Sequence, residues 1–193
     1  MKKLILGIAI GTIFLTACNN NSTDKSEASH TKTIDTSQVN TSINSGDIKK
    51  TVSIKEVVNS YLQIKNGLAN DNGNDAASAA KAIVIAINDV DKSQFTVAQI
   101  KTYSDLADDA KEMAEHISNN AGKLEHQREH FEMLSNDIYD LVKTFGAGQK
   151  IYKDFCPMYN NKGAIWLSET KGIKNPYLGN KMPECGTVKE ELK

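Results

Sequence analysis

The strongest constraint on the fold is a run of four amphipathic segments between residues 53 and 145. In each segment apolar residues recur at spacings of three and four, which places them along one face of an α-helix. Short stretches rich in Asn and Gly separate the segments, which cover about residues 53–70, 75–89, 97–118 and 123–145. Helices joined by short connections pack by default as an up-down-up-down bundle. We therefore predict a mainly α fold built on a four-helix bundle.

Two of the predicted helices carry more specific expectations. Ser53-Ile54-Lys55-Glu56 has the pattern of a capping box, in which side chains satisfy the first free amides of a helix. Residues 75–89 are dense in alanine, and small side chains let a neighbouring helix approach closely. We therefore expect a capped start for the first helix, and we expect the second helix to be the most buried of the four.

The helical periodicity is absent from residues 147–193. A short extended run begins at Ile151, and residues 164–167 are a candidate strand. The pair Asn175-Pro176 marks a turn between polar stretches. These features predict a small irregular or β C-terminal subdomain over residues 147–193, beside a helical bundle over residues 51–146.

The N-terminal residues 1–17 have the three parts of a lipoprotein signal peptide. Lys2 and Lys3 precede an apolar stretch that is too short to span a membrane, and residues 15–18 fit a lipobox. Cys18 is the predicted lipidation site, and its acyl chains anchor the mature protein to a membrane. Residues 18–50 are rich in Asn, Ser and Thr without apolar periodicity, so we expect a flexible polar tether there.

Composition and motifs argue against two classes of function. The formal net charge is -1, whereas a nucleic-acid-binding domain needs a basic face. The chain contains no glycine-rich phosphate loop, no Gly-x-Ser-x-Gly elbow, no His-Glu-x-x-His motif and no Cys-x-x-Cys motif. We therefore expect neither nucleic-acid binding nor enzymatic activity.

The residues best suited to a binding site form two sulfur clusters in the predicted C-terminal subdomain, Cys156 with Met158 and Met182 with Cys185. Thiolate and thioether ligands select soft ions, so this set indicates copper(I) or silver(I) as the cofactor. Trp166 is a candidate cover over such a site through a cation–π contact. Its alternative role is the packing anchor of a small subdomain.

Histidines extend this metal hypothesis into the bundle. His126 and His130 are four residues apart on one predicted helix face, and Met133 follows three residues later. Met113 and His116 share a face of the preceding helix. Spacing alone does not fix a ligand set, and solvent-facing or core roles explain the other residues. Only His130 enters the predicted ligand set, because the residue after it faces inward.

The same two cysteines support a second interpretation. Export favours disulfides, and a bridge between Cys156 and Cys185 closes a loop of about thirty residues, worth about 3 to 4 kcal/mol by loop entropy. A small irregular subdomain needs such a staple. A disulfide does not require Met158 and Met182, whereas a soft-metal site uses them. The residues leave both interpretations open.

Motifs in two regions carry a resemblance to a known family. The tail contains Cys156-Pro157-Met158, Gly163-Ala164 followed by Trp166-Leu167-Ser168, Asn175-Pro176-Tyr177, and Met182 ahead of Cys185-Gly186. The fourth segment contains Gln127-Arg128-Glu129-His130-Phe131 and Leu134-Ser135. These motifs resemble the domain-of-unknown-function 3347 family from about residue 53 onward. The resemblance implies a periplasmic domain of Gram-negative bacteria, found alone on lipoproteins or attached to membrane-fusion subunits of heavy-metal efflux pumps.

These observations predict a periplasmic protein anchored by lipid to a membrane, with the outer membrane favoured. Its predicted function is to bind copper(I) or silver(I) for sequestration or delivery to an efflux system, with a heavy-metal efflux membrane-fusion subunit as partner. The predicted ligands are Cys156, Met158, Met182 and Cys185, joined by His130. The alternative hypothesis is a disulfide-stapled, non-enzymatic interaction module of the cell envelope that binds no metal.

Overall fold

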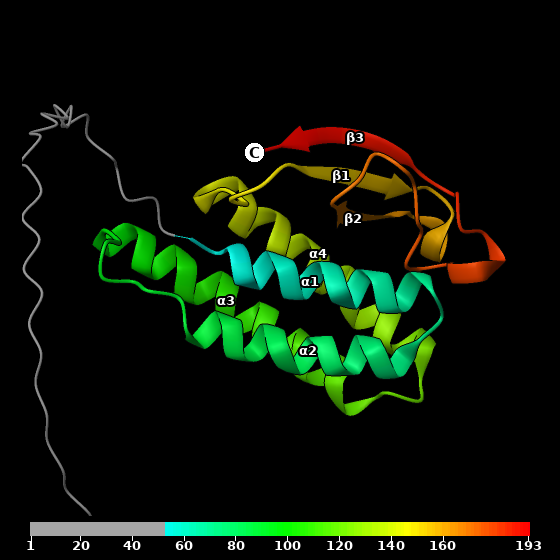
Figure 1. Ribbon diagram of the computed structural model, residues 1–193, viewed down its shortest axis with the longest axis horizontal. Coiled ribbons are helices and arrows are strands. Elements are labelled where there is room, and N and C mark those ends of the chain that lie inside the picture. The colour runs from blue at the N-terminus through cyan, green and yellow to red at the C-terminus, as the bar shows by residue number, and fades with distance from the viewer. Residues whose placement is uncertain (1–52) are drawn as a thin grey trace, which may run out of the picture. The chain divides into compact units, whose positions relative to one another are not determined.

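The computed structural model describes residues 53–193, so the predicted signal peptide, the lipidation site Cys18 and the polar tether lie outside the described residues. Within residues 53–193, four α-helices precede a small antiparallel sheet (Figure 1). The helices are α1 (Lys55–Ala69), α2 (Gly73–Asn88), α3 (Val97–Asn119) and α4 (Leu124–Phe145). The mainly α fold with a helical bundle is therefore confirmed. In this part of the chain, no helix combines the length and the apolar character needed to cross a membrane.

Different interactions fix the N-termini of α1 and α3. A capping box opens α3, because the Thr96 hydroxyl accepts from the Gln99 N–H and the Gln99 side chain accepts from the Thr96 N–H. The capping box expected at residues 53–56 is wrong, since α1 has Ile54 at its N-cap and no side-chain cap. Ile54 is buried in the core. Apolar packing therefore fixes the start of α1.

The most buried helix is α1, with ten of its fifteen residues buried against seven of sixteen in α2. The expectation that the alanine-rich helix is the most buried is therefore wrong. The reason is the position of the sheet, which lies over α1 and α4 on the side away from α2 (Figure 1). As a result α1 is covered from both sides.

The sheet has the strand order β2-β1-β3, and both pairs are antiparallel. β1 (Ile151–Cys156) and β2 (Ala164–Ser168) coincide with the two extended segments expected from the sequence. The sequence pattern did not indicate β3 (Thr187–Leu192), because this edge strand is mostly exposed and half of its residues are charged. Along β1, the buried side chains of Asp154 and Cys156 face the helices, as the alternation of a strand requires.

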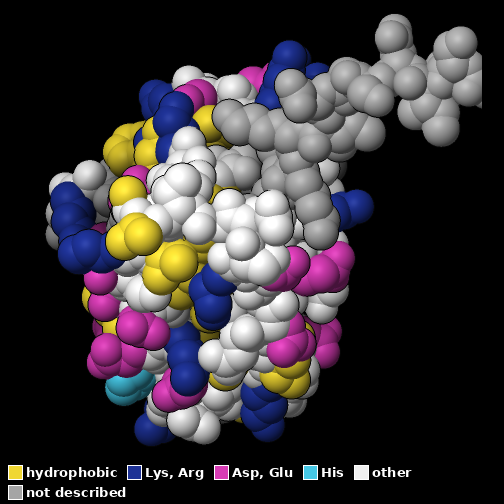
Figure 2. All heavy atoms as spheres, turned by 90° about the vertical axis from the view of Figure 1, so that its left-hand side faces the viewer, with side chains coloured by type: hydrophobic (Ala, Val, Ile, Leu, Met, Phe, Trp, Pro, Cys, Tyr) yellow, Lys and Arg dark blue, Asp and Glu magenta, His cyan; other side chains and the backbone are white. Residues whose placement is uncertain are grey.

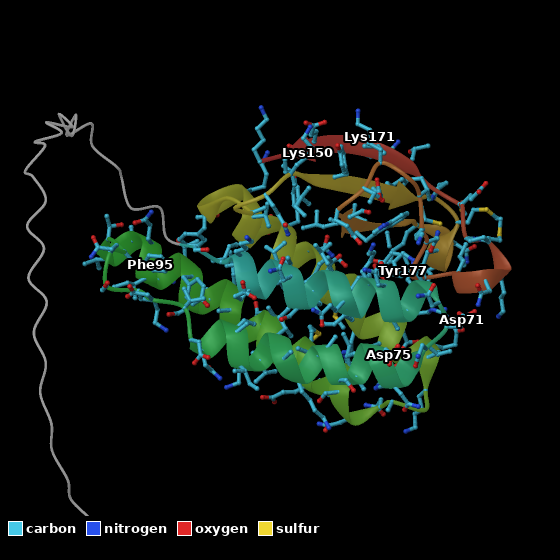
Figure 3. All side chains as sticks on the ribbon, in the orientation of Figure 1. Asp71, Asp75, Phe95, Lys150, Lys171 and Tyr177 are labelled. Carbon is cyan, nitrogen blue, oxygen red and sulfur yellow. The ribbon has the colours of Figure 1, made fainter. Side chains whose placement is uncertain are left out.

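A layer of buried hydroxyl groups joins the sheet to the bundle. The hydroxyl of Tyr61 on α1 lies 2.8 Å from Ser135 Oγ on α4, and it accepts from the Leu167 N–H of β2 at 3.0 Å. Tyr177 enters the same layer from the C-terminal segment (Figure 3), and its hydroxyl donates to Ser135 Oγ at 3.4 Å. The sheet is therefore fixed on α1 and α4 through specific polar contacts.

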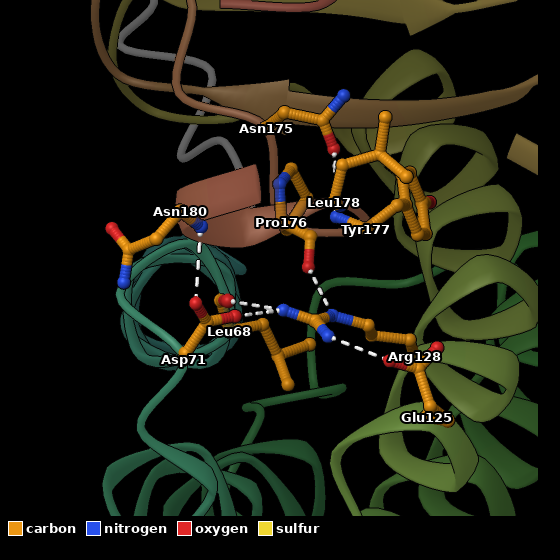
Figure 4. Close-up of polar contacts among 9 residues, drawn as sticks. All are labelled: Leu68, Asp71, Glu125, Arg128, Asn175, Pro176, Tyr177, Leu178 and Asn180. Carbon is orange, nitrogen blue, oxygen red and sulfur yellow. Dashed lines mark hydrogen bonds and ion pairs between the residues drawn. The ribbon is translucent and has the colours of Figure 1, made fainter. Parts of the chain in front are cut away.

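Arg128 of α4 forms a second junction between the bundle and the C-terminal segment (Figure 4). Its Nε donates to the Pro176 carbonyl at 2.9 Å, and its terminal nitrogen donates to the Leu68 carbonyl and the Asp71 carboxylate. Asp71 also accepts from the Asn180 N–H at 3.0 Å. Arg128 thus connects α4, the end of α1 and the loop that leads to β3.

Candidate functional site

The fold brings together the two cysteines that the sequence singles out. Cys156 ends β1 and Cys185 lies just before β3, and their Sγ atoms are 3.1 Å apart although 29 positions separate them in the chain. Both are free thiols. Cys156 is fully buried, whereas Cys185 is partly exposed. The thiol pair (Cys156 and Cys185) therefore offers one buried and one accessible sulfur.

Hydrogen bonds favour the thiolate form of Cys156. Burial opposes its ionisation, but the Cys185 thiol, the Met158 N–H and the Asn175 side-chain amide donate to its sulfur. The net effect lowers the pKa of the Cys156 thiol. The contact with Cys156, followed by burial, raises the pKa of the Cys185 thiol. A single negative charge on the thiol pair therefore lies on Cys156, with Cys185 as its hydrogen-bond donor.

The two methionines of the expected soft-metal site do not contribute in the same way as the cysteines. The side chains of Met158 and Met182 are 58% and 41% exposed. Within residues 53–193, no hydrogen bond joins either thioether to the thiol pair, and Met158 reaches Cys156 through its backbone N–H. The structure thus gathers two thiols at this position and leaves the thioethers at the surface.

Trp166 lies beneath the segment that carries Cys185. It is fully buried in β2, and a Cβ added at Gly186 would stand 2.6 Å from its Cη2 atom. The indole ring and the Gly186 backbone are therefore in close contact, which only a residue without a side chain permits. Trp166 is therefore a packing residue against the Gly186 backbone, next to Cys185 in the chain.

His130 lies elsewhere, between α3 and α4. With His116 of α3 and His126 of α4 it forms a group whose ligand nitrogens all lie within 4.8 Å of one another. In the described part of the chain, no such group joins His130 to the thiol pair. The five expected ligands are therefore not brought together. They are divided between the thiol pair and this histidine cluster (His116, His126 and His130).

The rings of the histidine cluster are in direct contact. Nε2 of His126 lies 3.2 Å from Nε2 of His130, and the rings of His116 and His130 stack with centroids 4.3 Å apart. Nδ1 of His130 is 3.5 Å from the Met113 sulfur, and Nδ1 of His126 is 3.4 Å from the Glu129 carboxylate. Because these partners occupy Nδ1, the Nε2 atoms of both rings are available to an ion.

Electrostatics and exposure both favour metal access. Burial and the neighbouring His116 and His126 lower the pKa of His130, so this imidazole is neutral and can act as a ligand. The side chains of His116 and His126 are 47% and 40% exposed. Figure 2 shows histidine at the surface beside acidic side chains. An ion can therefore reach the histidine cluster directly from solvent.

The spacing of the ligand atoms fits one small transition-metal ion. Nitrogens bound to a tetrahedral ion at about 2.0 to 2.1 Å stand about 3.3 Å from one another. The 3.2 Å between the Nε2 atoms of His126 and His130 agrees with this value. His116 belongs to the same group, and to complete a three-imidazole set its ring must turn out of its stacking on His130. Such sets suit zinc and copper.

Sequence reasoning placed His130 in a site but left His116 and His126 out. The signals were two pairs at helical spacing, His126 with His130 and Met113 with His116. The spacing within each helix does not show how α3 packs against α4. This packing brings the face with Met113 and His116 against the face with His126 and His130.

One family matches the chain by its sequence model. The family is described as protein of unknown function (DUF3347), and the match covers residues 57–150. This region holds the whole histidine cluster and ends before Cys156. No curated protein and no solved structure matches the chain.

Proposed function

We propose that this chain, which belongs to the DUF3347 family through residues 57–150, is a metal-binding protein that holds one copper ion between α3 and α4. The observation that carries the proposal is the convergence of three imidazoles from two helices, with all ligand nitrogens within 4.8 Å. The ligands are His116, His126 and His130. In this proposal the protein binds and transfers an ion and catalyses no reaction.

The surroundings of the histidine cluster favour copper over other ions. Imidazole binds both copper and zinc, and among divalent first-row ions copper binds more tightly than its neighbours to the same donor set. Met113 places a polarisable sulfur 3.5 Å from His130 Nδ1. Three nitrogen donors satisfy the low coordination number of copper(I), and silver(I) is expected to follow it. The proposed metal site is thus the histidine cluster, in place of the site at the thiol pair that was expected from the sequence.

The cellular setting is part of the proposal and is supported by the sequence. The lipobox ending at Cys18 and the resemblance to domains carried by efflux subunits favour a lipid-anchored periplasmic protein. In that setting a copper site that opens to solvent supports sequestration of the ion, or its delivery to a membrane-fusion subunit. The exposure of His116 and His126 supports ligand exchange with a partner.

The test is a copper(I) titration against a competing chelator, under argon, of the full chain carrying Cys18→Ser. We expect one copper per chain, and we expect loss of that copper in the triple variant His116→Ala, His126→Ala, His130→Ala. His30→Ala is the matched control, because His30 is the one histidine of the sequence outside the histidine cluster. This variant should bind copper like the parent.

Three outcomes contradict the proposal. Full copper retention by the triple histidine variant would remove the histidine cluster from the site. Loss of copper in Cys156→Ser with Cys185→Ser, and not in the histidine variants, would return the metal to the thiol pair. Displacement of bound copper by an equal amount of zinc would contradict the choice of ion.

A further inference from the structure

We infer that the thiol pair is a redox centre, in which Cys156 and Cys185 exchange electrons with an external disulfide and close reversibly into a disulfide of their own. This activity is independent of the histidine cluster and does not depend on the proposed metal. The Sγ atoms stand 3.1 Å apart as free thiols, so bond formation at about 2.05 Å needs a shift of about 1 Å.

The two sulfurs have different roles because their surroundings differ. Cys185 is partly exposed, whereas Cys156 is fully buried at the end of β1. An external disulfide can therefore reach only Cys185. The pKa of Cys156 is lowered and that of Cys185 is raised by their contact, so Cys156 is the first of the two to ionise, with the Cys185 S–H as its hydrogen-bond donor. The buried thiolate is thus the base that accepts the proton of the attacking thiol.

Asn175 holds this arrangement in place. Its side chain is fully buried, and its Nδ2 donates to the Cys185 carbonyl at 2.5 Å as well as to the Cys156 sulfur. Its Oδ1 accepts from the N–H groups of Tyr177 and Leu178, which fixes the orientation of the amide. One residue thereby positions the backbone of one cysteine against the sulfur of the other.

The exchange proceeds in two steps that balance. In the first, the proton of Cys185 moves to Cys156, the Cys185 sulfur bonds to one sulfur of an external disulfide RSSR, and RS⁻ leaves. In the second, the Cys156 thiol gives its proton to RS⁻, and its sulfur attacks Cys185 Sγ and expels the second RS⁻. The thiol pair loses two electrons, and RSSR is reduced to one thiol and one thiolate, which takes its proton from solvent.

The same hydrogen bonds distinguish a reversible couple from a permanent staple. A disulfide is reduced readily when its dithiol form is stabilised and when the departing thiol has a lowered pKa. The donors around Cys156 supply both conditions. The exposure of Cys185 lets a reductant reach the bond. The alternative reading from sequence, a static bridge, requires a disulfide that resists reduction.

The experiment uses the full chain with Cys18→Ser, so that only two thiols remain, in the presence of a metal chelator. The protein is equilibrated with glutathione at a series of ratios of disulfide to thiol, quenched in acid and alkylated, and its intact mass is measured. We expect a single transition from two alkylated thiols to none, with the same midpoint reached from the oxidised and reduced sides. The triple histidine variant should show the same transition, which separates this test from the copper test.

Two single variants test the assigned roles. Cys156→Ser should accumulate one glutathione on Cys185, because nothing remains to resolve the mixed disulfide. Cys185→Ser should react with glutathione disulfide at least tenfold more slowly than Cys156→Ser, because its remaining thiol is buried. Should either variant fail to fold, the transition of the parent protein still tests the couple.

Three results overturn the inference. The first is a disulfide that forms but resists a large excess of reduced glutathione, which is the behaviour of a static staple. The second is a parent protein that keeps glutathione on Cys185 without closing the pair. The third is a protein whose two thiols stay reduced at every ratio.

Discussion

The guanidinium of Arg128 donates through Nε to the main-chain carbonyl of Pro176, 2.9 Å away, although the two residues belong to different parts of the fold. The side chain of Arg128 is buried, and it also pairs with Asp71 (Figure 4). A buried guanidinium loses its hydration, and its protein partners replace the lost hydrogen bonds. Arg128 therefore anchors the loop that carries Asn175 toward the thiol pair to α4, in addition to the contact between Tyr177 and Ser135.

The first prediction concerns this anchor. Arg128→Met keeps the length of the side chain but leaves the Pro176 carbonyl without its donor and removes the guanidinium from the Asp71 carboxylate. Asp71 keeps the Asn180 N–H, and the Leu68 carbonyl keeps the Asp71 N–H. We expect the free energy of unfolding to fall by about 1 to 3 kcal/mol, the cost of a buried acceptor that has lost its donor, because the Asp71 side chain is 32% exposed and its charge stays hydrated. Urea denaturation followed by far-UV circular dichroism measures the change.

The matched control is Lys101→Met on α3. Lys101 also forms an ion pair, with Asp105 at 2.6 Å, but both side chains are largely exposed. Its removal should change the free energy of unfolding by less than about 0.5 kcal/mol. Equal effects of the two substitutions would contradict the role given to Arg128.

The helices were predictable because the apolar spacing of three and four records which face each helix buries. How deeply each helix is buried could not be predicted from this spacing, because α1 is covered by a sheet whose strands lie about a hundred residues later in the chain. β3 left no signal, because an exposed edge strand has no buried face to mark with apolar residues. Local pattern thus indicates which elements form, and tertiary contacts decide which of them is central.

The two centres differ in how far the sequence reveals them. Cys156 and Cys185 are the two cysteines that remain when Cys18, the predicted lipidation site, is set aside, so scarcity alone links them. His116 and His130 are linked only by the packing of α3 on α4, which stacks their rings. Helical spacing places residues on a face, but it does not state which face meets which. For this reason the sequence did not indicate that His130 lies beside His116 and His126.

The second prediction concerns the crossing of α1 and α2. An alanine at Gly67 would favour the helix by up to about 1 kcal/mol through backbone entropy. A Cβ there would stand 2.7 Å from the backbone nitrogen of Ala76, so the two helices would have to separate. We expect Gly67→Ala to lower the free energy of unfolding by about 1 to 3 kcal/mol, as overpacking does.

The control for this prediction is Gly122→Ala, where an added Cβ meets no atom within 4 Å. Thermal unfolding of both variants against the parent gives the comparison. If Gly67→Ala is more stable than the parent, α2 moves away from α1 at little cost in free energy. That result would contradict the view that the close approach of the two helices stabilises the fold.

The third prediction is a pH dependence that comes from Asp154. Burial raises the pKa of its carboxyl to about 7, an effect that the charge of Lys65 only partly opposes. Its two oxygens have no hydrogen-bond partner among residues 53–193. The folded protein therefore binds this proton more tightly than the unfolded chain does. The contribution of Asp154 to stability is present below about pH 4 and is lost as the pH rises to about 7.

Asp154→Asn removes this titration and keeps the shape of the side chain. The difference in unfolding free energy between variant and parent should grow in favour of the variant from pH 4 to pH 7, by on the order of 3 kcal/mol, and stay constant above pH 8. Urea titrations at five pH values between 4 and 9 measure the difference. A difference that is the same at every pH would show that Asp154 is ionised in the folded protein.

The fourth prediction concerns Met113 and the histidine cluster. The Met113 sulfur, 3.5 Å from His130 Nδ1, holds that ring so that Nε2 faces His126. Partners on the second nitrogen of a ligating histidine commonly change metal affinity by 10- to 100-fold. We expect Met113→Leu to weaken copper(I) binding about tenfold and to leave one copper per chain.

Met133→Leu on α4 is the matched control, because Met133 is 44% exposed and should not affect affinity. If both substitutions weaken binding equally, the sulfur of Met113 has no specific role, and loss of stoichiometry in Met113→Leu would instead make it a direct ligand.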